Sequence, residues 1–224
     1  MNVELIRYTA GALDVLFSAA RRCYSTDEDW KKRFTADYES RAKLVSKVIA
    51  SGHTSILEHI SYTFSVTGVS RVLSHQLVRH RHASYSQQSQ RYTAVDSIEG
   101  KYVMPPSIAH KSEAEELFCK TMEQIYMAYN NLIEFHLIPR EDARYLLPNA
   151  MHTSLVVTMN ARELYETFFP LRCCTRAQWE IRELAERILV LCKSTLPEVF
   201  SNAGPRCALL GRCPEEKSCG KYPS

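Results

Sequence analysis

Two spacings of apolar residues recur along the sequence, and together they predict strands separated by helices. Near the amino terminus VELIRY alternates like a short strand, and ALDVLFSAARRCY then carries apolar residues at helical spacing, with Thr9 as a candidate cap. The segment ISYTFSVTG alternates with the period of two that is typical of a half-buried strand, and SLVVTMN predicts another strand. The residues on the apolar side of ISYTFSVTG are Ile60, Tyr62, Phe64 and Val66.

Helical spacing governs most of the remaining sequence. Residues 37–50 place an apolar face on one side and stop at Gly52, and the following HTSILEH predicts a turn. Ser70 is a candidate cap for a helix through RVLSHQLVRHR, which would place the start of a basic cluster on a rigid support. Ser112 and Glu115 resemble a capping box at the start of a long amphipathic helix that reaches Pro139.

Three further helices, and the fold class, follow from the carboxyl-terminal half. A short helix containing Arg144 is expected, then a helix at ARELYETFF and a longer one at TRAQWEIRELAERILVLCK. The predicted fold class is therefore α/β of the α+β kind, with a central antiparallel or mixed sheet flanked by helices and one long helical segment.

Composition indicates a folded protein, and the sequence shows no obvious boundary between domains. The 224 residues, of which 45% are hydrophobic and 24% charged, suffice for one large domain or two small ones. We find no repeat and no linker, and we expect a single domain over 1–224 with a cysteine-containing tail at about 203–224. MNVELIRYTA is not followed by the apolar run of a secretory signal, so we expect a cytoplasmic protein that does not bind membranes.

One stretch concentrates positive charge although the net charge is only +3. RHRHASYSQQSQRY, from Arg79 to Tyr92, contains three arginines, two histidines, three serines and three glutamines. No Asp or Glu occurs between Glu58 and Asp96, an interval that also contains Arg71. The local excess predicts a binding site for a negatively charged ligand; a basic coat for nucleic acid would need a larger overall charge.

The residue types in this stretch favour a nucleotide. Arginine presents a planar fork of donors that matches phosphate oxygens, and serine and glutamine suit a pyrimidine edge or a ribose. The alternative is an ordinary solvated basic loop. His53 and His59 lack the spacing of a standard zinc helix, which disfavours a metal hydrolase.

Four separated motifs resemble one enzyme family. Arg79, His80 and Arg81, followed after seven residues by Ser89, resemble the R-H-R-x7-S signature of flavin-dependent thymidylate synthase, the ThyX family. HTSILEH resembles the family's His-x5-His turn, NAREL its Asn-x-Arg flavin segment, and LRCCTRAQWEIR its arginine-bearing region before the last helix.

The resemblance implies a homotetramer with shared active sites that binds FAD and converts dUMP to dTMP. It implies methylenetetrahydrofolate as the carbon donor and NADPH as the reductant of the flavin, with no nucleic acid as partner. The implied dUMP contacts are Gln76, Arg79, Gln87, Ser89, Arg91, Arg144 and Arg172. The implied FAD contacts are His53, Ser55, Arg79, His80, Arg81, Gln87, Asn160, Arg162 and Glu166.

Two of these residues carry the expected chemistry. Negative charge accumulates on the uracil ring as C5 becomes nucleophilic, and an arginine fixed at the N3/O2 edge stabilises that charge. We assign this catalytic role to Arg172. Ser89 is expected to hydrogen-bond the nucleotide and not to attack it, because a serine nucleophile needs an oriented base.

The sequence departs from the family pattern at two places. Gln87 occupies a position that is often acidic, and one residue more than usual separates Asn160 from Arg172. The additional residue brings Glu166 or Thr167 to the place of a flavin-contacting Asn or His. A carboxylate there would repel the flavin phosphates.

Two questions stay open from sequence. Cys207, Cys213 and Cys219 recur every six residues in the tail. They could be free thiols, ligands of a structural metal together with Cys173 or Cys174, or members of disulfides. We assign no metal. The rival function is a non-catalytic RNA- or nucleotide-binding module that uses Tyr85 and Tyr92 for base stacking.

Overall fold

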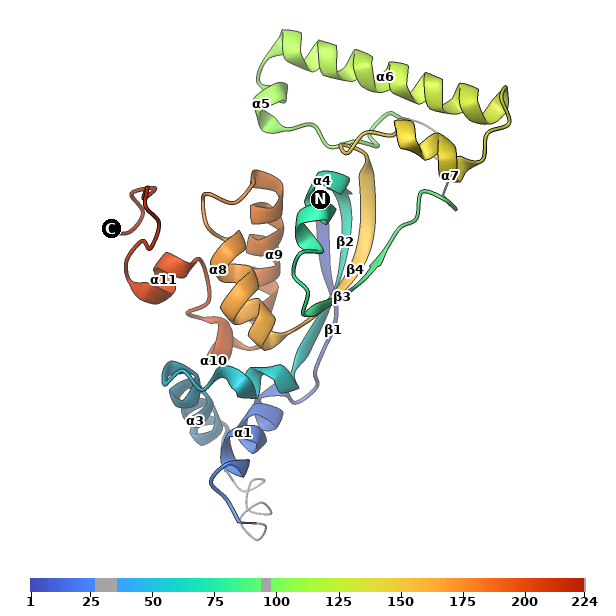
Figure 1. Ribbon diagram of the computed structural model, residues 1–224. Coiled ribbons are helices and arrows are strands. Elements are labelled where there is room, and N and C mark those ends of the chain that lie inside the picture. Colours follow the sequence, from blue (N-terminus) through green and yellow to red (C-terminus); the bar gives the residue numbers. More distant parts are fainter. Residues whose placement is uncertain (27–35, 94–97, 224) are drawn as a thin grey trace. The chain divides into compact units, whose positions relative to one another are not determined.

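The computed structural model describes residues 1–26, 36–93 and 98–223, and one four-stranded sheet organises them. The strands are β1 (Asn2–Tyr8), β2 (Ser61–Ser70), β3 (Ala83–Gln87) and β4 (His152–Asn160), in the order β1-β2-β4-β3 (Figure 1). Arg71 N–H donates to Met151 O at one end of the β2–β4 pair, and Ala161 N–H donates to Ile60 O at the other. These two strands are therefore antiparallel, and the expected α+β class is confirmed.

The alternation predicted for β2 is confirmed by burial. Ile60, Tyr62, Phe64 and Val66 are all buried, as are Leu155, Val157 and Met159 on β4. Because successive side chains of a strand point to opposite faces, one face of these central strands carries the apolar residues. Removing this apolar surface from water is the main favourable term for folding.

Contacts divide the chain into two compact units. Unit 1 comprises Met1–Asn2, Val66–Arg79 and Tyr85–Val156, and unit 2 comprises Val3–Ser65, His80–Ser84 and Val157–Ser224. β2 and β4 contribute residues to both units. The single domain expected over 1–224 stays a prediction.

Unit 2 contains most of the helices. They are α1 (Ala12–Arg22), α3 (Tyr38–Ala50), η2 (Thr54–His59), the π-helical η4 (Glu163–Phe168), α8 (Phe169–Arg172), α9 (Trp179–Thr195), α10 (Pro197–Phe200) and α11 (Arg206–Leu210). α8 packs on α9, and α1 packs on α3 (Figure 1). Ile181, Leu184, Ala185 and Ile188 form the buried face of α9, as the helical spacing predicts.

The amino-terminal caps in unit 2 follow the sequence only in part. Asp37 accepts a hydrogen bond from the Ser40 N–H and caps α3. Thr9 does not cap α1, which is a correction: its hydroxyl accepts from the Ser61 N–H at 3.0 Å. Gly11 occupies the cap position of α1 with φ 62°, a left-handed conformation that glycine adopts without a Cβ clash.

Unit 1 contains α4 (Arg71–Leu77), α5 (Pro106–Ala109), the long α6 (Ser112–Glu134), α7 (Arg140–Ala143) and η3 (Arg144–Leu146). Ser70 caps α4 as predicted, and its hydroxyl accepts from the Leu73 N–H at 3.0 Å. α4 ends at Leu77, so Arg79 follows the helix and does not lie on it, which corrects the helix expected through RVLSHQLVRHR.

The capping box expected for α6 does not form. Lys111 holds the cap position and makes no side-chain cap bond, while Ser112 is already the first helical residue. A hydroxyl inside the first turn is no longer placed to accept from the third amide, which explains the difference. None of the helices in the described ranges is long and apolar enough to span a membrane.

Candidate active site

The segment after β4 positions the first candidate residues in unit 2. Asn160 ends the strand, and its Oδ1 accepts a hydrogen bond from the Glu163 N–H at 2.8 Å, which caps the helical segment that begins at Ala161. η4 follows over Glu163–Phe168 and leads directly into α8, which ends at Arg172. A π-helical bond spans one residue more than an α-helical bond, so η4 has room for the additional residue that the resemblance implies between Asn160 and Arg172.

Three side chains from this region are linked by hydrogen bonds. His80 Nδ1 lies 2.8 Å from Glu163 Oε1, and Arg172 Nε–H donates to His80 Nε2 at 3.0 Å. His80 is 4% exposed and Glu163 6% exposed, whereas Arg172 is half-buried. Phe168 packs edge-on against the imidazole, with ring centroids 5.1 Å apart. We call this arrangement the Glu163–His80–Arg172 relay.

The environment of His80 favours a neutral imidazole. Burial lowers the pKa of His80, the hydrogen bond with Glu163 opposes that change, and the charge of Arg172 lowers the pKa further. The net direction is downward from the usual value. Both ring nitrogens of His80 are engaged within unit 2; its expected FAD contact stays a prediction.

A pocket of about 440 Å³ opens next to the relay in unit 2. Its lining consists of Glu58, His82, Asn160, Arg162, Glu163, Glu166 and Thr167. Three residues expected at FAD, namely Asn160, Arg162 and Glu166, therefore line one cavity. Glu163 contributes to both the pocket and the relay.

Glu166 does not stand in this pocket as an isolated negative charge. Its carboxylate accepts from Arg162 Nε at 2.7 Å and from the Thr54 hydroxyl, and Arg162 also pairs with Glu58. Burial raises the pKa of Glu166, but the hydrogen bonds from Thr54 and Arg162 outweigh burial, so the net pKa is lowered. The repulsion expected between Glu166 and flavin phosphates is thus reduced by a neighbouring cation.

Other expected FAD residues lie on the surface. His53 precedes η2, and Ser55 lies within it, where the sequence predicted a turn; both are exposed. Arg79 and Arg81 are exposed on either side of the buried His80. Within the R-H-R motif, the two arginine side chains are therefore exposed to solvent, whereas the histidine side chain is buried.

Most expected dUMP contacts belong to unit 1. Gln87 Nε2 donates to the Ser74 hydroxyl at 3.1 Å and to the Thr153 hydroxyl at 3.0 Å, which fixes its amide on α4 and β4. Gln76 is half-buried on α4. The side-chain amide of Gln87 is therefore held by two neutral hydroxyl groups. In the family this position is often acidic.

A second part of the dUMP set surrounds Glu141 in unit 1. Arg91 Nη2 pairs with the Glu141 carboxylate at 2.9 Å, and Arg144 Nε donates to the Glu141 main-chain oxygen at 3.0 Å. The Ser89 hydroxyl accepts from the Arg91 N–H at 3.2 Å. The structure therefore brings Ser89, Arg91 and Arg144 into one neighbourhood.

Arg71 was not among the residues expected at the site. Its Nη2 donates to Gln88 O at 3.1 Å, while its buried Nε has no hydrogen-bond partner among the described residues. Burial lowers the pKa of Arg71, and the charge of Arg144 lowers it further. The sequence did contain one indication that Arg71 is a candidate for the site. Arg71 lies between Glu58 and Asp96, in the interval that contains no Asp or Glu.

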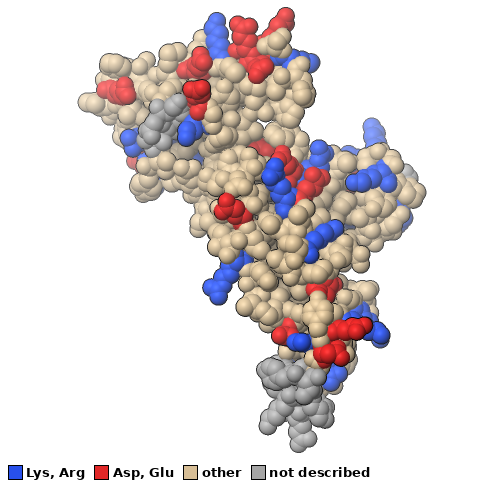
Figure 2. Space-filling model, turned by 180° about the vertical axis from the view of Figure 1, so that it is seen from behind, with Lys and Arg blue, Asp and Glu red and all other residues tan. Residues whose placement is uncertain are grey.

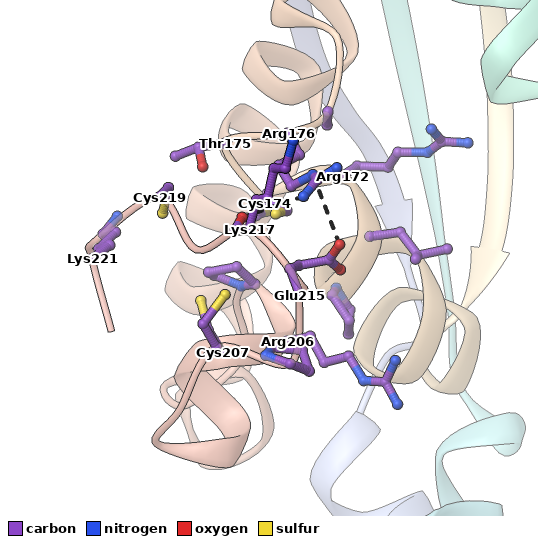
Figure 3. Close-up of a pocket in the computed structure, with 17 residues that line it drawn as sticks. Arg172, Cys174, Thr175, Arg176, Arg206, Cys207, Glu215, Lys217, Cys219 and Lys221 are labelled. Atoms are coloured by element: carbon purple, nitrogen blue, oxygen red, sulfur yellow. Dashed lines mark hydrogen bonds and ion pairs between the residues drawn. The ribbon is translucent and has the colours of Figure 1, made fainter. Parts of the chain in front are cut away.

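A second pocket, of about 260 Å³, lies in unit 2 between the tail and residues 170–177, and Arg172 of the relay is one of its lining residues (Figure 3). Cys174, Cys207 and Cys219 reach it from three segments, and Arg176 pairs with Glu215 at 3.8 Å on its wall. All eight cysteines are free thiols. Within the described ranges no cluster of three or more His, Cys, Asp or Glu side chains is arranged to hold a metal ion.

Comparisons with known proteins agree with these motifs. The sequence profile of the family described as "Thymidylate synthase complementing protein" matches residues 4–198. Flavin-dependent thymidylate synthases from Nitratidesulfovibrio vulgaris and Geobacter sulfurreducens are each 45% identical to this chain over 99% of its length, which covers 95% and 94% of those proteins.

A solved structure shows the same fold. The flavin-dependent thymidylate synthase ThyX from Helicobacter pylori, complexed with FAD and dUMP, superposes with a TM-score of 0.73 at 25% identity, covering 91% of this chain and all of that one. Sequence motifs, family profile and fold thus agree: the chain belongs to the flavin-dependent thymidylate synthase family.

Proposed function

We propose that this protein forms dTMP by reductive methylation of dUMP, with methylenetetrahydrofolate as carbon donor and NADPH-reduced FAD as hydride source. Family membership defines the reaction. The observation that carries the assignment of the site is the pocket in unit 2 that is lined by Asn160, Arg162 and Glu166, three of the residues expected at the flavin.

The residues of this pocket suit a dinucleotide. Arg162 pairs with Glu166 through Nε and with Glu58 through Nη1, so only its remaining N–H groups are left to donate to phosphate oxygens. The Asn160 amide and Thr167 hydroxyl supply directional donors, and the carboxylates can accept from ribose hydroxyls or an adenine amino group. The volume falls within the range of about 300–1,000 Å³ that is usual for small-molecule sites. When bound there, FAD supplies the redox chemistry that amino-acid side chains lack.

Arginines and neutral polar groups would hold the nucleotide. We assign Arg91 and Arg144 to the phosphate, with Ser89 as a further hydrogen-bonding group, and Arg172 to the pyrimidine edge. A positive charge fixed at that edge stabilises the negative charge that develops on the ring and so raises the reactivity of C5. In this mechanism no protein side chain forms a covalent bond with the substrate.

Unit 1 carries features of an assembly surface. Leu117 on α6 is 68% exposed and Leu137 82% exposed, and Met127, Phe135 and Tyr145 are also exposed. A patch of exposed large apolar side chains marks an interaction site, and these five side chains lie on α6 and in the residues that follow it. They support the proposed homotetramer with shared active sites. The cytoplasmic location stays a prediction.

The rival nucleic-acid module has less support. Tyr85, one of the two residues expected to stack on bases, donates its hydroxyl to Leu77 O at 2.7 Å and is only half-exposed. On the described part of the face in Figure 2, Lys and Arg side chains are interspersed with Asp and Glu and form no continuous basic surface. Phosphate-backbone binding depends on such a surface.

Flavin absorption tests the proposal directly. The protein mixed with FAD should retain a flavin absorption band after gel filtration, and anaerobic NADPH should bleach that band.

Replacing Arg172 with Ala should abolish dTMP formation while flavin reduction continues. The matched control is Arg187→Ala on α9, where Arg187 pairs with Glu183 on the surface. A protein that retains no FAD but retards RNA in a gel would favour the rival function.

A further inference from the structure

The Glu163–His80–Arg172 relay assigns a role to two residues that do not themselves need to touch the substrate. We propose that Glu163 and His80 are positioning residues, which fix the Arg172 guanidinium in the orientation that the pyrimidine of dUMP requires. The inference rests on the proposed role of Arg172 at the pyrimidine. It differs from the family resemblance, which implied His80 only as a contact of FAD.

Glu163 determines which nitrogen of His80 carries the proton. An ionised carboxylate can only accept hydrogen bonds, so the Nδ1 that lies 2.8 Å from Glu163 Oε1 must be the protonated nitrogen. In a neutral imidazole the other nitrogen, Nε2, is then an acceptor. Arg172 can only donate, and its Nε–H meets this acceptor at 3.0 Å. The three side chains therefore match in donor and acceptor order.

Burial keeps this order in place. His80 and Glu163 are almost completely buried, and the Phe168 ring packs against the imidazole, so water cannot easily replace either bond. A doubly protonated imidazole would present an N–H to the Arg172 N–H, and the bond would be lost. The low exposure of His80 disfavours that charged form.

The bond to His80 uses one of the five N–H groups of Arg172 and fixes the plane of the guanidinium. A planar fork recognises its ligand only when the plane is correctly oriented. A half-buried arginine held only by solvent would lose rotamer freedom on binding dUMP, which weakens binding. The relay removes much of that freedom before the nucleotide arrives.

The local backbone brings the ends of the relay together. Glu163 begins η4 with its N–H capped by Asn160, and Arg172 ends the α8 segment that follows η4 without interruption. Glu163 and Arg172 thus reach the same imidazole from opposite ends of one continuous helical segment. Because Glu163 also lines the pocket assigned to FAD, the relay joins that pocket to Arg172 within unit 2.

Two amide variants of His80 separate its two hydrogen bonds. In His80→Gln the side-chain oxygen comes near the position of Nε2 and can still accept from Arg172. In His80→Asn the shorter amide comes near Nδ1 and can bond only to Glu163. Both variants carry the same functional group and differ by one methylene, so they form a matched pair.

Titration of the FAD-loaded enzyme with dUMP gives the first readout. Loss of one hydrogen bond to a charged group weakens binding by about tenfold or more. We expect His80→Asn to raise the Kd for dUMP by about that factor and His80→Gln to restore most of the affinity. Wild-type dUMP affinity in His80→Asn, or equal dUMP affinities of His80→Asn and His80→Gln, would overturn the inference.

The tautomer of His80 gives a second readout that needs no activity. Nitrogen NMR of histidine-labelled protein should show His80 protonated at Nδ1, with the signal assigned by its loss in His80→Gln. Glu163→Gln should allow the other tautomer, because an amide can donate as well as accept. Protonation at Nε2 in the wild-type protein would contradict the relay.

Arg172→Ala separates this inference from the proposed function. If Arg172→Ala weakens dUMP binding and His80→Asn does not, the relay has no positioning role while the proposed function stands. If Arg172→Ala leaves dUMP affinity unchanged, the proposed role of Arg172 fails and the inference fails with it. Weaker dUMP binding in both variants, with rescue in His80→Gln, supports both.

Discussion

At the scale of single residues, a neutral buried histidine is the least expected part of the site. His80 lies between two exposed arginines in the sequence, yet its imidazole is enclosed and bonded on both sides. Such a group couples folding to pH, because the folded chain resists protonation and the unfolded chain does not. The same residue that orients Arg172 therefore makes stability depend on pH.

The direction of this dependence can be predicted. The pKa of His80 is lowered in the folded chain, chiefly by burial, while the unfolded chain takes up a proton near the usual value of 6.5. As the pH falls below 6.5, the unfolded state binds more protons, and the free energy of unfolding decreases. Urea denaturation between about pH 7 and pH 5 should show this decrease, and His80→Gln should show a smaller one.

His152 provides the internal control for that measurement. Its pKa is also lowered, first by burial and then by the amino terminus and Lys101, so it contributes in the same direction. His152 is present in both proteins, and the difference between the two pH profiles isolates His80. Identical profiles would refute the neutral, buried state of His80.

Asn160 allows its structural and binding roles to be separated. Asn160→Ala removes the acceptor for the Glu163 N–H and should lower the free energy of unfolding by about 1 kcal/mol. Asn160→Asp keeps an acceptor and should retain that stability, but its added charge should weaken FAD binding. Thermal denaturation and FAD titration of both variants test the two roles. Full FAD affinity in both would exclude Asn160 from the flavin site.

At the scale of secondary-structure elements, two serines that look alike in sequence behave differently. Ser70 lies outside α4 and its hydroxyl accepts from the Leu73 N–H, whereas Ser112 lies inside α6 and makes no cap bond. The position of one residue relative to the first turn decides whether a hydroxyl satisfies an unpaired amide. α4 carries Gln76, so its cap also supports the nucleotide site.

This difference gives a matched pair of substitutions. Ser70→Ala should lower the free energy of unfolding by about 1 kcal/mol because a buried amide loses its acceptor. Ser112→Ala should leave stability unchanged within about 0.5 kcal/mol, as expected for an exposed serine without a bond. Urea denaturation of both variants distinguishes them. Equal losses would show that the cap of α4 contributes nothing specific.

The sequence predicted strands and long helices better than it predicted their ends or the contacts between them. Period-two alternation identified β2, and helical spacing identified the buried face of α9, because burial itself produces those patterns. It could not show that Glu163 meets His80, since 83 positions separate them. It also could not show that the segment before Arg172 is π-helical, because this depends on how β4 and α8 are held.

At the scale of the whole molecule, the candidate residues are distributed over two units. Unit 1 holds Gln76, Gln87, Ser89, Arg91 and Arg144, and unit 2 holds the pocket proposed for FAD together with Arg172. The exposed apolar side chains of unit 1 favour assembly into an oligomer. A site completed by neighbouring copies, as we propose, would cover Arg79, Arg81 and Arg91, which are exposed in the single chain.

The mass of the oligomer can be measured, and a substitution can then weaken its proposed interface. Sedimentation equilibrium should give the mass of four chains of 25.7 kDa each. Leu117→Lys on α6 should shift the protein towards smaller species, because a charge replaces an apolar side chain in the proposed interface. Circular dichroism serves as the control that the variant is folded. A wild-type protein that sediments as a single chain would contradict the shared active site.

The most direct test of the account is an anaerobic assay for dTMP. The protein would be supplied with dUMP, methylenetetrahydrofolate, FAD and NADPH, and each component would be omitted in turn. We predict that dTMP forms in the complete mixture, fails to form when any one component is missing, and is lost in Arg172→Ala. Bleaching of the flavin without dTMP in the complete mixture, or full dTMP formation by Arg172→Ala, would contradict the account.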